Sequence, residues 1–235
     1  MQKINSLNKE GIKKNLAIFE GGLGSKDNGR EPMARYASFD YCFNYFQGFK
    51  NKKELASREN IQNSCLHVAF YLASWGMLRG SSFLLNKSIK YYESLIKYIS
   101  EQDSSFWKID VSNYSEDTIE RLIKCSNDIK KILSDNGKYK VSDTLVTKIM
   151  LGVFGNVPAF DAYFKTGSGL GTFNKKSLMS IHDFYTKDSY SELVSHEANK
   201  IKTFDYDSGK AGSRAYTKAK IIDMIFFIEG YKNGR

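Results

Sequence analysis

Residues 137 to 165 read GKYKVSDTLVTKIMLGVFGNVPAFDAYFK, and this stretch carries the strongest structural and chemical signals of the chain. It begins with a glycine-containing turn that carries two lysines, after which Ser142 is well placed to cap a helix. The apolar run 145–153 has helical spacing and ends at glycines. Pro158 fixes its own backbone angle, so we expect Asp161 near the start of another helix. The stretch therefore predicts a hairpin of two helices followed by one rigidly held carboxylate.

Apolar residues at steps of three and four predict helices along most of the remaining chain. The clearest segment is 60–77, where two such rows leave almost no polar face and predict a buried helix. Further helices are predicted over 12–19, 36–49, 87–100, 115–134, 177–199 and 216–231. With only two prolines, the chain is expected to be all-α, with about eight to ten helices and at most two short strands.

Length and composition allow one domain or two closely packed lobes. A chain of 235 residues with 41% hydrophobic content can bury a core of ordinary size. The polar segment 102–114, anchored by Phe106 and Trp107, is the best candidate for a boundary. We expect one helical domain over 1–235. The alternative has two lobes: 36–101 plus the closing C-terminal helices, and 115–200.

The charge balance favours a polyanionic partner. The chain has 35 Lys and Arg against 26 Asp and Glu, which gives a net charge of +9. A lysine-rich solvated surface would give the same count, so the charge alone leaves both interpretations open.

Localisation and cofactors are predicted from what the sequence lacks. The first residues have no apolar signal-peptide core, and the apolar stretches are shorter than the roughly 20 residues of a membrane span. The three cysteines are far apart and are expected to be buried thiols of a reduced cytoplasmic protein. His67, His182 and His196 are isolated, so we expect no metal site. We also expect no other cofactor and no membrane partner.

Two glycine-rich segments are predicted to be loops. Residues 20–29 and 166–172 are both rich in glycine, but no predicted strand precedes either one. A phosphate-binding or dinucleotide-binding loop is therefore not expected at these places.

The turn of the hairpin is a candidate DNA-binding element. Gly137, Lys138, Lys140 and Ser142 lie where exposed backbone amides and a helix N-terminus would hold a phosphate without reading sequence. Arg79, between two glycines and before two serines, could meet a phosphate or a substrate as well. The alternative for Arg79 is pairing with a carboxylate at a helix end.

The order of hairpin, apolar helix and Val157-Pro158-Ala159-Phe160-Asp161 resembles the active-site segment of the helix-hairpin-helix DNA glycosylase superfamily. These are all-α enzymes that flip a damaged or modified base out of DNA and cut its N-glycosidic bond. The resemblance implies that Asp161 stabilises the cation-like sugar or prepares the nucleophile. The other possible role of Asp161 is an ordinary helix N-cap.

The position of the lysines bears on the type of reaction. Family members with lyase activity place a lysine at the start of the second hairpin helix, where it forms a Schiff base with the sugar. Here Lys140 precedes that position and Lys148 lies inside the helix, and the second glycine usual in the family hairpin is missing. We keep Lys148 as a second candidate catalytic residue and expect simple hydrolysis.

A flipped base needs a pocket with aromatic walls, for which Trp75, Phe160 and Tyr163 are the candidates. The sequence thus predicts a DNA glycosylase acting in repair or in defence against foreign DNA with modified bases, with DNA as partner and no obligate protein partner. The alternatives are a non-catalytic helical nucleic-acid-binding module and a helical scaffold or small-ligand protein.

Overall fold

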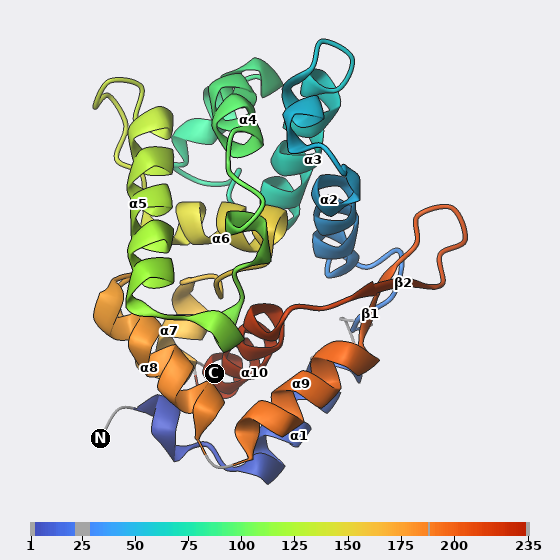
Figure 1. The fold of residues 1–235 in the computed structure, drawn as a ribbon, viewed down its shortest axis with the longest axis vertical. Helices are drawn as coiled ribbons and strands as arrows, with labels where there is room; N and C mark the ends of the chain where they lie inside the picture. The colour runs from blue at the N-terminus through green and yellow to red at the C-terminus, as the bar shows by residue number, and fades with distance from the viewer. Residues whose placement is uncertain (1–2, 22–28, 188, 234–235) are drawn as a thin grey trace.

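The computed structural model describes residues 3–21, 29–187 and 189–233, which form ten α-helices and one two-stranded antiparallel sheet (Figure 1). The α-helices are α1 (Lys9–Gly21), α2 (Ala37–Gly48), α3 (Ile61–Ser74), α4 (Glu93–Ser100), α5 (Glu116–Leu133), α6 (Asp143–Phe154), α7 (Ala162–Ser168), α8 (Lys175–Thr186), α9 (Tyr190–Lys200) and α10 (Lys218–Asn233). The strands are β1 (Lys202–Phe204) and β2 (Ala211–Ala215). Short 3-10 helices cover Lys3–Ser6, Lys52–Ala56, Phe83–Asn86, Ile89–Tyr92, Phe106–Lys108 and Val111–Asn113. The all-α prediction is confirmed, whereas most of the predicted 20–29 loop lies outside the described residues. None of the described helices combines the length and apolar character that a membrane crossing requires.

Helix α6 is the centre of the fold. Every residue from 145 to 154 is buried, and all of them except Thr147 and Lys148 are apolar, so the helix lies inside the core. It packs against α2, α3 and α5, and Figure 1 shows it between α5 and the α2–α3 pair. The Ser142 hydroxyl accepts a hydrogen bond from the Leu145 N–H, so the predicted N-cap is present.

The last helix fixes the position of α7. Helix α10 packs on α7, α1 and α9. A Cβ atom on Gly167 would lie 2.0 Å from the carbonyl oxygen of Phe226, and one on Gly230 would lie 1.8 Å from that of Tyr163. The two backbones therefore touch, and only glycine fits at these two positions.

Two predicted helices differ from the observed ones. The segment 177–199 was expected to form one helix, but it forms α8 and α9 because the buried rows are out of phase, with a step of five from Tyr185 to Tyr190. The backbone at Lys187 is extended, which ends α8. Helix α3 is not fully buried, since Leu66 and Phe70 are 43% and 70% exposed. The apolar row that contains Leu66 and Phe70 faces solvent. The spacing of residues in the sequence does not show which of two rows packs against another helix.

The segment 102–114 belongs to the core. Phe106, Trp107 and Tyr114 are buried in the same hydrophobic cluster as α6 and α10. The Tyr114 hydroxyl donates to the Asn156 carbonyl oxygen, and the Asp110 carboxylate accepts from the backbone amides at the start of α10. These contacts join the segment to both proposed lobes.

The three cysteines are free and buried, as predicted. Burial raises the pKa of the Cys65 thiol to about 11 and that of the Cys125 thiol to about 12. These side chains therefore remain neutral thiols near pH 7, and their reactivity toward oxidants is low.

His67 makes stability depend on pH. Its ring stacks on Tyr45 with centroids 3.9 Å apart, and burial lowers the pKa of His67 from its ordinary value of 6.5. The unfolded chain then binds the proton more readily than the folded chain, so the free energy of unfolding should fall as the pH drops through 6.5. Urea titrations at several pH values should show a smaller fall for His67→Gln than for the wild type. The exposed His196→Gln is the control, and an equal fall in all three proteins would contradict this role.

Candidate functional site

A pocket of about 460 Å³ lies where the end of α3, the middle of α6, the start of α7 and the end of α10 meet. It is lined by Arg35, Ala73, Ser74, Trp75, Gly76, Met77, Arg79, Thr144, Lys148, Asp161, Ala162, Tyr163, Phe227 and Tyr231. Five of the residues singled out in the sequence therefore meet at one place, namely Arg79, Lys148, Asp161, Trp75 and Tyr163.

Asp161 is both a helix cap and a pocket residue. Its Oδ1 accepts a hydrogen bond from the Phe164 N–H at 3.0 Å, which caps α7. Its Oδ2 binds the Lys148 ammonium at 3.0 Å, and the two side chains are 15% and 6% exposed. One oxygen serves the helix and the other faces the lysine, so the capping role does not remove Asp161 from the site.

The loop before Asp161 is held by α6. The Thr147 hydroxyl oxygen accepts from the Phe160 N–H at 2.8 Å, and the Thr144 hydroxyl donates to the Phe160 carbonyl oxygen at 2.8 Å. The Asp161 N–H donates to the Ala159 carbonyl oxygen at 2.8 Å. The carboxylate is thus fixed by bonds on both sides of the loop, as a preorganised site requires.

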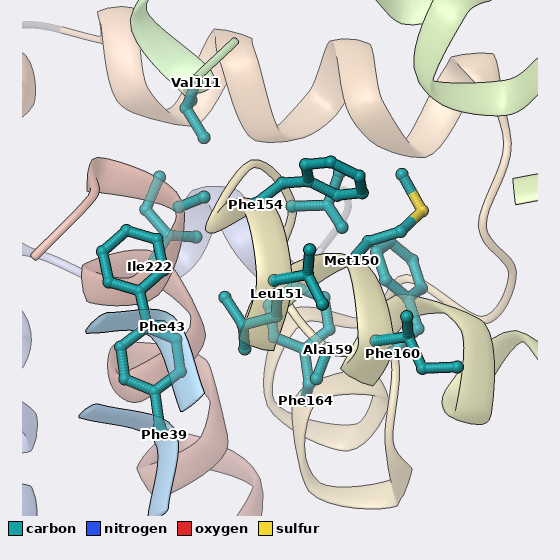
Figure 2. Packing of buried hydrophobic residues seen from close by; sticks show 14 of the residues in the cluster. Phe39, Phe43, Val111, Met150, Leu151, Phe154, Ala159, Phe160, Phe164 and Ile222 are labelled. Carbon is teal, nitrogen blue, oxygen red and sulfur yellow. The ribbon is translucent and has the colours of Figure 1, made fainter. Parts of the chain in front are cut away.

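Phe160 does not line the pocket, contrary to its expected place there. It is fully buried and packs against Phe164 and Phe173 with ring centroids 5.0 and 5.4 Å away. Figure 2 shows it among the core side chains of α6 and α7. Because the backbone of Phe160 is bonded to α6 through both its N–H and its carbonyl, the side chain is directed into the core.

The aromatic walls also come from α10. Phe227 and Tyr231 line the pocket, and Tyr163 contacts both rings at centroid distances of 5.1 and 5.5 Å. The sequence pattern placed the apolar residues of α10 in the core and gave no sign that this end of the helix reaches the site. The spacing of four between Phe227 and Tyr231 shows only that they share a face.

The pocket is rich in positive charge. Its described lining residues include three cations, Arg35, Arg79 and Lys148, against the single carboxylate Asp161. The Lys148 ammonium lies 5.0 Å and the Arg35 guanidinium 5.9 Å from the centroid of the Trp75 ring. Since the Lys148 ammonium pairs with Asp161, Arg79 adds a further positive charge to the pocket, which favours an anionic ligand.

The backbone N–H groups of the hairpin turn between α5 and α6 donate to oxygen atoms within the turn itself. Asp135, Asn136 and Gly137 all have positive φ values, of 51°, 57° and 85°. The Gly137 N–H donates to the Ser134 hydroxyl oxygen, and the Tyr139 N–H donates to the Ser134 carbonyl oxygen. The expectation that Gly137 offers an amide to phosphate therefore does not fit the structure. Its contribution is the left-handed backbone of the turn.

The lysines of the turn line a second hollow of about 510 Å³. It is lined by Gly76, Met77, Arg79, Ser81, Ser82, Phe83, Lys138, Tyr139, Lys140, Ser142 and Leu145. Tyr139 stacks on Phe83 with ring centroids 4.6 Å apart, which holds the turn against the 3-10 helix Phe83–Asn86. The hollow thus combines Lys138, Lys140 and Ser142 with Arg79.

Arg79 connects the two hollows. Gly76, Met77 and Arg79 line both, so the segment after α3 forms the ridge between them. A Cβ atom at Gly76 would lie 3.2 Å from Arg79 Nε, and the φ of +73° at Gly76 also favours glycine. The arginine therefore lies against a glycine backbone and lines both the pocket and the second hollow, which is called the basic groove from here on.

No protein-family model, curated protein or solved structure matches this chain. Among the described residues, no group of three histidine, cysteine or carboxylate side chains is placed to hold a metal ion.

Proposed function

We propose that this chain is a DNA glycosylase that hydrolyses the N-glycosidic bond of a damaged or modified base. The observation that carries the proposal is the position of Asp161: a carboxylate fixed at a helix start, inside an aromatic pocket that adjoins a basic groove. The pathway served by such an activity would be repair, or defence against foreign DNA that carries modified bases.

The pocket suits a flipped base. Its volume of about 460 Å³ falls in the usual range of small-molecule sites. Trp75, Tyr163 and Phe227 offer ring faces and edges for a base that has left the stack. The adjoining groove, with Lys138 and Lys140, would hold the phosphates next to the flipped nucleotide.

Asp161 would act on the sugar. Breaking the N-glycosidic bond builds positive charge on the sugar ring, and a fixed carboxylate in a water-poor site stabilises that charge. Lys148 holds Oδ2 of the carboxylate at 3.0 Å and would release it toward the developing cation. A salt-bridged ammonium has no lone pair for attack on the sugar, so simple hydrolysis is favoured over a lyase reaction.

The direct test measures abasic-site formation in duplexes that each carry one damaged or modified base. We expect release of at least one base without a covalent product after borohydride treatment. A borohydride-trapped complex would indicate a Schiff base and hence a lyase. DNA binding without release from any duplex would favour the non-catalytic nucleic-acid-binding module.

The groove lysines should account for part of the salt dependence of DNA binding. Each neutralised phosphate contributes about −0.9 to the slope of log affinity against log salt. Replacing Lys138 and Lys140 with alanine should therefore flatten the slope by up to about 1.8 units. Lys13→Ala/Lys14→Ala, with two exposed lysines removed from α1, is the charge-matched control. Equal slopes in the two double variants would place the DNA surface elsewhere.

A further inference from the structure

Helix α10 contains a buried ion pair behind the pocket. The Lys220 ammonium binds Asp223 Oδ2 at 2.8 Å, and the two side chains are only 3% and 9% exposed. Rings of Phe19, Phe39 and Trp75 surround the ammonium at centroid distances of 5.2, 4.8 and 5.4 Å. A buried pair of this kind usually stabilises a protein no more than apolar side chains of the same size would. Its presence calls for a role other than stability.

The other oxygen of Asp223 reaches the loop that carries Asp161. Asp223 Oδ1 accepts a hydrogen bond from the Ala159 N–H at 2.9 Å. The Ala159 carbonyl oxygen in turn accepts from the Asp161 N–H at 2.8 Å. A continuous chain of polar contacts therefore runs from Lys220 through Asp223 and Ala159 to the backbone of Asp161.

Neither member of the pair lines the pocket, but Lys220 lies against Trp75, which does. Both lysines lie near the Trp75 ring, with the Lys220 ammonium 5.4 Å and the Lys148 ammonium 5.0 Å from its centroid. Tyr71 also faces the pair, and burial together with the charges of Asp223 and Asp161 raises the pKa of its phenol. Both carboxylates thus lie close to one buried tyrosine, while only Asp161 opens to the pocket.

We infer that Asp223 is a positioning residue, which sets the place of the Asp161 carboxylate through the backbone of Ala159. This inference rests on the proposed glycosylase function. Asp223 does not line the pocket; it binds the Ala159 N–H, whereas Thr144 and Thr147 bind the backbone of the next residue, Phe160. Since a misplacement of about 1 Å can lower a rate about 100-fold, loss of this contact should be visible in turnover.

Two double variants distinguish the effect of the hydrogen bond to Ala159 from the effects of the buried charges and of overall stability. Lys220→Met/Asp223→Asn removes the ion pair but keeps an oxygen that accepts from Ala159. Lys220→Met/Asp223→Leu removes that acceptor as well and leaves an apolar core. We expect the asparagine variant to keep kcat for base release within about threefold of the wild type. The leucine variant should lose about 100-fold in kcat at saturating DNA, with an unchanged Kd for DNA.

The outcomes decide the inference. A structural role alone would lower the melting temperature and the amount of folded protein, but it would not lower kcat in one double variant while sparing the other. Equal kcat values in the two double variants would overturn the inference. So would a leucine variant with full turnover.

A second measurement does not depend on enzymatic activity. Urea unfolding of Asp161→Asn, Lys220→Met/Asp223→Leu and their combination forms a double-mutant cycle. If the contact through Ala159 joins the two sites, the unfolding equilibrium constants should deviate from additivity by about tenfold. Additive effects would overturn the positioning role. If the wild type released no base from any duplex, the proposed function would fail, and this cycle would still decide the role of Asp223.

Discussion

Asp161→Asn should lower the rate of base release by about 10²- to 10³-fold, while DNA affinity stays close to that of the wild type. The asparagine keeps the size of the side chain and an oxygen that can accept from the Phe164 N–H, so α7 remains capped. What disappears is the negative charge that would stabilise the cation-like sugar. The measurement is abasic-site formation on the duplex found to be a substrate, wild type against variant.

The same variant should be less stable than a simple cap replacement. For a helix N-cap alone, asparagine in place of aspartate would cost little stability, because both side chains cap helices well. The structure places the Lys148 ammonium, only 6% exposed, against this carboxylate, so the change leaves a buried charge without its partner. Removal of one member of such a pair costs about 3 kcal/mol.

The matched control restores the charge balance. In Lys148→Met/Asp161→Asn no buried charge is left unpaired, so we expect the melting temperature to recover while base release stays lost. Full activity in either variant would contradict the role assigned to Asp161. Recovery of activity together with stability would mean that only folding had been impaired.

Local rules were sufficient for the elements around the site. The Ser142 cap, the buried α6 and the turn with Gly137 follow from cap chemistry, apolar spacing and the glycine position. The place of Asp161 at the start of α7 follows from Pro158 and the residue pattern behind it. Each of these depends on residues within one or two helical turns, where sequence reasoning is strongest.

The contacts that complete the site are not local. Lys148 meets Asp161 only because the chain reverses at Gly155, whose φ is +68°. Helical spacing does not predict which residues face each other after such a reversal. Phe227 and Tyr231 reach the pocket because α10 crosses α7 at close range. Phe160 is turned away because two threonines of α6 bind its backbone. None of these three outcomes has a sequence signal of its own.

The turn shows the same limit at shorter range. A glycine followed by two lysines suggested free amides, but three successive residues with positive φ bring the amides of Gly137 and Tyr139 back onto Ser134. A composition rich in turn formers predicts a turn, whereas the direction of its N–H groups depends on the φ values that the chain adopts. Phosphate contacts in the groove would therefore come mainly from the lysine side chains.

Gly230→Ala should be the most damaging single change to the fold. The new Cβ would lie 1.8 Å from the Tyr163 carbonyl oxygen, and that backbone cannot move without displacing α7. Overpacking against backbone costs about 3 kcal/mol or more, which for a chain of this size lowers Tm by about 6–12 °C. Thermal melting and urea titration measure the change directly.

Gly48→Ala is the matched control. Gly48 is also a helical glycine, but no atom lies within 4 Å of its added Cβ, and alanine is the better helix former. Its Tm should stay equal or rise slightly. If Gly230→Ala melted like Gly48→Ala, the close approach of α7 and α10 would be contradicted. The rigid placement of Asp161 would be contradicted as well, because Asp161 caps α7 and this contact with α10 holds α7 in place.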